Sequence, residues 1–369
     1  MEIDARERFV RTLTFKKADR IPFVGDGYWR QTINRWYTEG LPTNVDVEDY
    51  FGFDKGVEDI PIYLGPLPSY VPRLLGETDR YRIEVKEIGV TCKELKVGMS
   101  MPEFIDFPIK TSKDWDTFKK RLDPHDPRRY PRYWGNELIE YYNSADHPIA
   151  LGDGASVSPP VHVGFFGMLR RYMGFVPLVK AFYQYPEWVH GMMDYLADFY
   201  IEALTPAAEQ VKIDCAWVWE DIAFNEGPLI SPALFKEFVL PCYRKLTAFY
   251  RKHGIEIVIV DSDGDLRTLI PLFIEGGVKH FWPLEARAHM DVVALRKQYS
   301  KNIGLLGNID KRALVEGKEA IEKELESKLP PLIESGGFIP HIDHSVPPDV
   351  PFQNYRYYIN LLKRYIGLA

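Results

Sequence analysis

Cysteines and long apolar runs are scarce in this sequence. Its three cysteines, Cys92, Cys215 and Cys242, are odd in number and far apart, which does not indicate a disulfide framework. No stretch approaches the roughly 20 consecutive apolar residues that a membrane-spanning helix needs. The opening MEIDARERFV is charged and lacks the apolar core of a signal peptide. These features predict a cytoplasmic protein that does not engage a membrane.

Runs of lysine or arginine are also missing, and the formal net charge is −7. Nucleic-acid binding draws most of its affinity from neutralising phosphates, so this charge argues against a nucleic-acid partner. The composition is 46% hydrophobic and 27% charged, which is typical of a soluble globular protein with a large core. A length of 369 residues suits a single α/β barrel.

Short apolar runs alternate with longer amphipathic stretches along most of the chain. Helical patterns follow the later runs, and one begins at the capping residue Ser231, followed by Pro232, and ends at Gly254. Such alternation predicts parallel strands joined by helices, and about eight units predict a closed (β/α)8 TIM barrel. An open doubly wound sheet is the alternative, although no G-x-G-x-x-G motif supports it. The candidate strands begin at Arg20, Gly56, His147, Asp214, Ile255, Lys279, Asn302 and Gly337.

One segment near the N-terminal end interrupts this alternation. From Asp79, DRYRIEVKEIGVTCKELKVGM alternates polar and apolar residues, which predicts a β-hairpin or meander, and a polar, proline-marked stretch follows. No repeat or low-complexity linker marks a boundary. We therefore expect one barrel domain over residues 1–369, with a β-hairpin and helical excursion between barrel units.

The stretch IEIVIVDSDGD, from Ile255, changes character within one residue, from an apolar run to alternating aspartates. Successive side chains of a strand point to opposite faces, so Asp261 and Asp263 are expected to share a direction. Gly264 allows a sharp turn. Asp265 is expected to cap a helix beginning near Leu266.

Other candidate strands end in polar residues too. Barrel enzymes build their sites at this end of the strands, so these side chains are expected to converge on one mouth. Carboxylates gathered there repel one another unless a cation, a proton or a basic group intervenes. The alternative for any one of them is a helix cap or an exposed side chain. The set comprises Asp153, Glu220, Asp221, Asp261, Asp263, Glu285, Asn308, Asp310, His341, Asp343 and His344.

Several long stretches resemble the uroporphyrinogen decarboxylase superfamily. They include WEDIAFNEGPLISPALFKEFVLPCYRKL, VDSDGDLRTLIPLFIEGGVKHFWPLEARAHMDVVALRKQY, GNIDKRALVEGKEAIEKEL and HIDHSVPPDVPFQNYRYYINLLKRY. The opening RERFVRTLTFKKADRIPF is similar as well, so the resemblance runs along nearly the whole chain. It implies a distorted (β/α)8 barrel. The superfamily holds decarboxylases of a porphyrin precursor and zinc-dependent methyltransferases that serve a corrinoid cofactor.

The decarboxylase branch is matched only loosely. Its members carry an M-R-Q-A-G-R-type segment whose arginines hold the carboxylates of the substrate, whereas GYWRQTINRWYTEG offers Arg30 and Arg35 without that pattern. Its catalytic aspartate has only loose counterparts in Asp54 and Asp59. A substrate with eight carboxylates needs a basic cleft, and the expected mouth is acidic. Decarboxylation is therefore the alternative to methyl transfer.

The methyltransferase branch predicts a metal site. Its zinc-binding positions correspond by resemblance to Asp261, Asp263 and His344, with oxygen and nitrogen in place of thiolate ligands. Such ligands suit zinc or another divalent ion that stabilises the leaving alkoxide of a methoxylated donor. Glu220 and Glu285 are candidates for a further ligand or a general acid, and Tyr172 corresponds to a tyrosine beside the substrate. The catalytic prediction therefore comprises Glu220, Asp221, Glu285 and Tyr172.

The partners expected from this resemblance are a small methyl donor and a corrinoid. Tryptophans beside the strand ends, in WVWED and FWPLE, suit stacking on an aromatic donor, although large barrels also bury aromatics for packing alone. No Asp-x-His-x-x-Gly motif is present, so the cobalamin is expected to be free or carried by a partner protein. A non-catalytic barrel that binds a ligand or a corrinoid protein is a third hypothesis. The sequence leaves the oligomeric state open, with a homodimer as one candidate.

Overall fold

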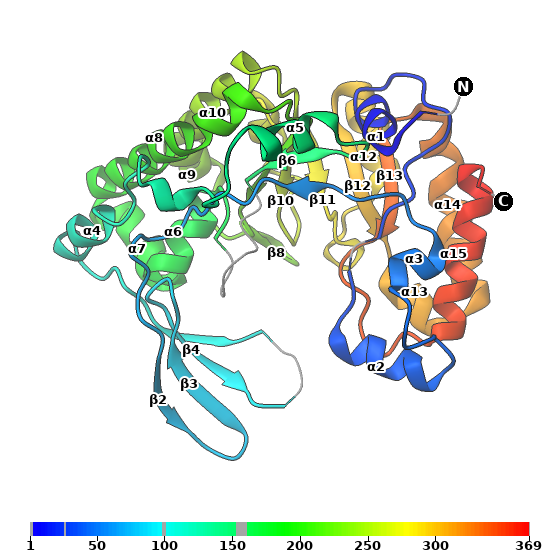
Figure 1. Cartoon of the computed structure of the whole chain (residues 1–369), viewed down its shortest axis with the longest axis horizontal. Helices are drawn as coiled ribbons and strands as arrows, with labels where there is room; N and C mark the ends of the chain where they lie inside the picture. Colours follow the sequence, from blue (N-terminus) through cyan, green and yellow to red (C-terminus); the bar gives the residue numbers. More distant parts are fainter. Residues whose placement is uncertain (1–2, 26, 98–100, 153–160, 369) are drawn as a thin grey trace.

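A curled parallel sheet lies at the centre of the molecule (Figure 1). The structure is a computed structural model that describes residues 3–25, 27–97, 101–152 and 161–368. Neighbouring strands in this sheet all pair in parallel. Across the sheet, the seven strands of the described part are β1 (Glu58–Asp59), β6 (Ile149–Leu151), β7 (Cys215–Trp219), β10 (Ile257–Asp261), β11 (His280–Trp282), β12 (Gly304–Ile309) and β13 (Phe338–Ile342).

The apolar runs of the sequence account for these strands. β12 is buried along its whole length and β10 up to its last residue, as expected for strands covered on both faces. The run that begins at Arg20 differs, because within the described residues it forms no strand, and Tyr28 makes only an isolated parallel bridge to Val346. The α/β class is therefore confirmed, while the closed eight-stranded barrel stays a prediction.

The helices connect and surround this sheet. No helix in the described ranges is long and apolar enough to cross a membrane. The predicted helix after Ser231 is present, and the Ser231 hydroxyl accepts a hydrogen bond from the Leu234 N–H. The helices are α1 (Ala5–Leu13), α2 (Arg30–Thr38), α3 (Val47–Phe51), α4 (Ser112–Lys119), α5 (Asn136–Ser144), α6 (Phe166–Met173), α7 (Phe175–Gln184), α8 (Pro186–Gln210), α9 (Pro232–Leu234), α10 (Leu240–Lys252), α11 (Ile270–Glu275), α12 (Val292–Tyr299), α13 (Lys311–Glu316), α14 (Lys318–Ser335) and α15 (Phe352–Ile366).

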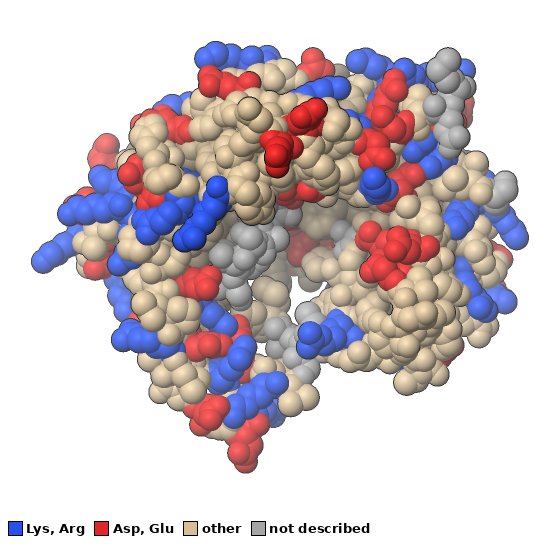
Figure 2. Space-filling model, in the orientation of Figure 1, with Lys and Arg blue, Asp and Glu red and all other residues tan. Residues whose placement is uncertain are grey.

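The predicted meander forms a second sheet, which is antiparallel and projects from the body of the molecule (Figure 1). It begins earlier than expected, because a strand precedes the turn at Asp79. The space-filling view shows the molecule hollowed between this sheet and the side that carries α2 (Figure 2). The strands of this sheet are β2 (Arg73–Glu77), β3 (Tyr81–Val85), β4 (Thr91–Leu95) and β5 (Glu103–Asp106), and a short hairpin of β8 (Ala223–Phe224) and β9 (Gly227–Pro228) lies elsewhere.

The two faces of the parallel sheet bury different clusters. Val258 and Val260 of β10 pack into the large core shared with the helices, whereas Ile257 and Ile259 pack into a smaller cluster on the opposite, concave face. Asp261 follows the same alternation and lies on the concave side. The strand period therefore decides which side chains face the hollow of the sheet.

The approach of α6 to the end of β7 depends on glycine. A Cβ atom at Gly167 would lie 2.5 Å from the backbone oxygen of Glu220, and one at Gly164 would lie 2.1 Å from that of Trp219. Both contacts are shorter than real Cβ atoms tolerate, so neither position accepts a larger residue without movement of the backbone.

Gly167→Ala is expected to destabilise the protein by about 1–3 kcal/mol, because the added methyl group overpacks the junction between α6 and β7. Gly191→Ala is the matched control. Gly191 also lies within a helix, α8, but nothing stands within 4 Å of its Cβ position. This second change should stabilise the protein by about 0.5–1 kcal/mol. Urea unfolding of both variants tests the prediction, and equal effects would contradict it.

Candidate functional site

Four side chains from separate strand ends form a group that we call the acidic mouth: Asp221, Asp263, Glu285 and His344. The Asp263 N–H donates to Asp221 Oδ1 over 3.3 Å, and the Gly264 N–H donates to Glu285 Oε2 over 3.3 Å. His344 Nε2 lies 3.8 Å from Asp263 Oδ2. Residues that follow β7, β10, β11 and β13 thus meet at the carboxyl end of the sheet.

Asp263 is the most perturbed carboxyl of this mouth. Burial, together with the negative charges of Asp221 and Glu285, raises its pKa to about 7, although Lys311 acts in the opposite direction. A carboxyl with this pKa exchanges its proton near neutral pH, which suits a general acid or base. Among the mouth residues, Asp263 is therefore the best placed to move a proton.

His344 faces Asp263 as a neutral ring. Burial and the charge of Lys311 lower its pKa. Its Nδ1 accepts a hydrogen bond from the Ser345 N–H over 2.8 Å, so in the neutral ring the proton sits on Nε2, the atom that faces Asp263. His344 is thereby oriented as a donor toward the Asp263 carboxylate.

Asp343 and Lys311 lie behind the mouth. Asp343 is almost fully buried, and its Oδ2 accepts the Ala286 N–H over 2.9 Å while Oδ1 lies 3.7 Å from Lys311 Nζ. Burial raises the pKa of Asp343, and the Lys311 ammonium opposes this shift. No local sequence pattern predicts that Lys311 faces these carboxylates, because it is the first residue of α13 and its partners follow other strands.

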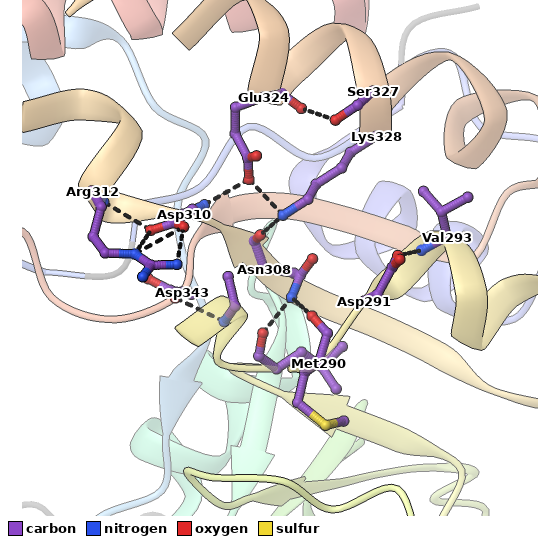
Figure 3. A network of polar contacts seen from close by, with 12 residues as sticks. Met290, Asp291, Val293, Asn308, Asp310, Arg312, Glu324, Ser327, Lys328 and Asp343 are labelled. Atoms are coloured by element: carbon purple, nitrogen blue, oxygen red, sulfur yellow. Dashed lines mark hydrogen bonds and ion pairs between the residues drawn. The ribbon is translucent and has the colours of Figure 1, made fainter. Parts of the chain in front are cut away.

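Two other strand-end residues, Asp310 and Asn308, form hydrogen bonds with backbone groups. Asp310 caps α13, accepts the Arg312 N–H over 2.9 Å and pairs with its guanidinium at 2.6 Å (Figure 3). Asn308 is fully buried and donates to the carbonyls of Leu284 and Met290 (Figure 3). These contacts give both residues structural roles.

An Asp-x-Arg pattern in the sequence marks such capping aspartates. Asp265 accepts the Arg267 N–H over 3.0 Å and pairs with the same guanidinium at 2.7 Å, as Asp310 does with Arg312. Asp265 therefore has the capping role expected for it, but it caps a turn, because α11 begins only at Ile270. Asp263, by contrast, has no arginine two residues later. Asp153 lies outside the described residues.

Glu220 lies away from the mouth. It is fully buried, accepts the N–H groups of Phe165 and Gly167 at 3.0 and 2.9 Å, and accepts the Tyr243 hydroxyl at 2.9 Å. Burial raises its pKa to about 7, although these donors act in the opposite direction. Glu220 thus caps the start of α6, and this geometry gives it a structural role.

Tyr172 also lies away from the mouth, in the helical layer. Its ring is 1% exposed and packs on Phe118 at 4.6 Å between centroids. The structure therefore brings Asp221 and Glu285 together with Asp263, and leaves the other two predicted catalytic residues inside the fold.

The predicted metal ligands are divided between two places. Asp263 and His344 belong to the mouth, whereas Asp261 lines a cavity on the concave side of the sheet. β10 ends at Asp261, and Ser262 and Asp263 lie beyond the strand, so the strand alternation does not extend to Asp263. Within the described part of the chain, no three histidine, cysteine or acidic side chains are placed to hold a metal ion. The residues as arranged do not form the predicted zinc site.

The cavity on the concave side, which we call the lumen cavity, has a volume of about 280 Å³. Trp217, Trp219 and Trp282 line it together with Asp261 and His341. His341 Nδ1 hydrogen-bonds to the Ile342 carbonyl at 2.8 Å, and its Nε2 accepts the Trp282 indole N–H at 3.1 Å. Burial lowers the pKa of His341 to about 4, so its ring is neutral at physiological pH.

A curled parallel sheet with ionisable groups at its carboxyl end is the arrangement of enzymes built on α/β barrels. The family model for uroporphyrinogen decarboxylase matches residues 166–365, more than half of the chain. The chain therefore belongs to the uroporphyrinogen decarboxylase family, as its sequence motifs predicted.

The individual relatives are distant. The chain is 24% identical over 195 residues to the uroporphyrinogen decarboxylase of Syntrophotalea carbinolica, covering 52% of each chain. It is 25% identical over 380 residues to that of Mannheimia succiniciproducens, covering 97% of each. It thus spans about half the length of several curated relatives it matches. A methyltransferase from Methanosarcina mazei shares the fold, with a TM-score of 0.60, 12% identity and 99% of each chain covered.

Glu220→Ala is expected to lower the free energy of unfolding by at least about 1–3 kcal/mol, because it leaves the N–H groups of Phe165 and Gly167 and the hydroxyl of Tyr243 without their acceptor. Glu326→Ala, at an exposed position within α14, serves as the control and should change stability by less than about 0.5 kcal/mol. Urea unfolding measures both. Equal stabilities would contradict the structural role of Glu220.

The pH dependence of stability tests the environment of Asp263. A carboxyl whose pKa rises on folding stabilises the protein below its ordinary value of 3.8, and this contribution is lost as the pH rises to about 7. The melting temperature of Asp263→Asn relative to wild type should therefore increase from pH 5 to pH 8.

Asp265→Asn is the matched control two residues away. Its hydrogen bonds to Arg267 lower the pKa of Asp265, so this carboxylate is ionised throughout that pH range in both folded and unfolded chains. The variant should be less stable than wild type by an amount that stays constant from pH 5 to pH 8. A flat difference for Asp263→Asn as well would contradict the raised pKa.

Proposed function

We propose that this chain is a methyltransferase, which moves a methyl group from a small methoxylated aromatic compound to a corrinoid carried by a partner protein. The observation that carries the proposal is the acidic mouth, where residues that follow four strands bring Asp221, Asp263, Glu285 and His344 together at the carboxyl end of the sheet. An ether oxygen needs a proton as its bond to the methyl group breaks, and Asp263, whose pKa is raised to about 7, is the candidate to supply it.

The proposed step transfers a methyl group from the ether oxygen and a proton to it. The bond between the methyl carbon and the ether oxygen breaks, and both of its electrons stay on the oxygen. The methyl group passes to the electron pair of the reduced corrinoid cobalt, while the proton of Asp263 goes to the oxygen. His344, whose Nε2 faces Asp263 at 3.8 Å, then stabilises the carboxylate that remains. Trp219, two residues before Asp221, places an indole ring beside the mouth that an aromatic donor can contact.

A divalent metal ion stays a prediction. Asp263 and His344 face each other, but Asp261 turns into the lumen cavity, so the three predicted ligands do not converge. The proposed proton transfer therefore uses the side chains of the mouth alone.

Decarboxylation of a porphyrin precursor is the second candidate, because curated relatives carry that name. Two of the groups it would need, Asp54 and Arg35, already have charged partners within the protein. Asp54 pairs with Arg20 at 2.5 Å and accepts the Phe23 N–H at 2.9 Å, while Arg35 pairs with Glu39 at 2.6 Å. The acidic mouth also repels a substrate with many carboxylates. These features favour methyl transfer.

The decisive experiment incubates the protein with cob(I)alamin and a panel of methoxylated aromatics. A methyl-cobalt spectrum is expected only when enzyme and donor are both present. Asp263→Asn should slow the reaction by about 10²- to 10⁴-fold, the usual contribution of a general acid, while Asp265→Asn retains most of it. Release of CO₂ from uroporphyrinogen without a methyl-cobalt signal would support the decarboxylase. Binding without either reaction would support a non-catalytic barrel.

A further inference from the structure

A second hollow, which we call the arginine groove, lies next to the acidic mouth. Its volume is about 480 Å³. Trp219 lines both this groove and the lumen cavity, so its indole borders the two hollows. Asp221 also lines the groove and belongs to the mouth through its contact with the Asp263 N–H. The groove therefore meets the mouth at Asp221.

Two cations from the last turn of α6 reach this groove. The guanidinium of Arg171 lies 4.1 Å from the centroid of the Trp219 ring, and that of Arg170 lies 5.6 Å from it. Arg170 Nη2 also approaches Asp221 Oδ2 at 3.4 Å. Burial lowers the pKa of Arg171 to about 10, so it keeps its charge at neutral pH. Among the described residues that line the groove, the two guanidinium groups outnumber the single carboxylate, that of Asp221.

The remaining walls are apolar. Phe104 and Phe107 come from β5 and the residue after it, and Phe175, Val176 and Pro177 begin α7. Phe175 and Val176 are 40% and 57% exposed, so these apolar surfaces are open to a ligand. Flat aromatic surfaces next to guanidinium groups are suited to a molecule that has an apolar ring and an anionic substituent.

We infer that the arginine groove binds a carboxylate-bearing aromatic donor, with its carboxylate on Arg170 and Arg171 and its ring against the apolar walls to which Phe107 and Phe175 belong. This inference rests on the proposed function and narrows the donor to an aromatic acid. A guanidinium matches a carboxylate with two parallel hydrogen bonds, which a neutral ring cannot use. The lumen cavity offers no comparable pair, because the lysine in its lining, Lys55, pairs with Asp146 at 2.8 Å and the lining also brings the carboxylates of Asp54 and Asp261. Charge thus directs the donor to the groove.

Binding alone tests the inference without a corrinoid. Titration calorimetry with a methoxybenzoate should show binding to wild type, and the neutral methoxybenzamide should bind at least about tenfold more weakly. Arg171→Gln should weaken binding of the acid by about 10- to 100-fold, the usual effect of losing a charge-assisted hydrogen bond. It should leave binding of the amide unchanged.

Arg170→Gln provides a second variant in case the more buried position is needed for folding. Its side chain is 27% exposed, and the same loss of affinity for the acid is expected. Lys180→Gln is the matched control, because it removes one positive charge from an exposed position of α7 outside the groove. It should not change binding of either compound.

The outcomes distinguish a failure of the inference about the groove from a failure of the proposed function. If the acid binds in an arginine-dependent way but no methyl transfer occurs, the groove binds aromatic acids and the proposed function is contradicted. If neutral ethers donate methyl groups and neither arginine variant changes the rate, the proposed function is supported and the inferred role of the groove is contradicted. Equal affinity of acid and amide for wild type would also overturn it.

Discussion

The hydrogen bonds that the Glu220 carboxylate accepts are the interactions on which the arrangement of the site depends. The carboxylate accepts two N–H groups from the start of α6 and the hydroxyl of Tyr243 on α10, and a carboxylate buried without such donors would be strongly unfavourable. Because it fixes α6 against the end of β7, the last turn of that helix reaches Trp219. The arginine groove follows from this junction, and Asp221, the residue after Glu220, connects it to the acidic mouth.

β7 and the two residues that follow it thus supply side chains to three different environments. Along β7, alternation turns Trp217 and Trp219 toward the concave side, where both line the lumen cavity. Glu220 then turns toward α6, and Asp221, with a φ of +41°, directs its carboxylate to the mouth. Acidic groups therefore gather at the mouth and the two arginines in the groove that meets it at Asp221, so the two regions suit different parts of one ligand.

Local patterns in the sequence predicted the family and most strands of the parallel sheet, but not the run at Arg20 or how the strand ends are arranged. The apolar runs before Asp261 and Asn308 form buried strands, because strands covered on both faces need continuous apolar residues. The alternation ends with β10 at Asp261, so Asp261 lines the lumen cavity while Asp263 belongs to the mouth. Lys311 could not be found from sequence, because its contacts join segments that only the fold brings together.

Aspartates serve both as caps of turns and helices and as groups that transfer protons. The residues next to each aspartate distinguish the two roles. Asp265 and Asp310 each have an arginine two residues later, which lowers the pKa of the carboxyl and fixes it in a turn. Asp263 has carboxylates for neighbours instead, and burial and their repulsion keep a proton available on it near neutral pH. A ligand with one negative charge can place that charge on the arginines and its ether at the mouth. A ligand with many carboxylates would bring some of them against Asp221 and Glu285, so the same charge division that admits an aromatic acid disfavours a polycarboxylate.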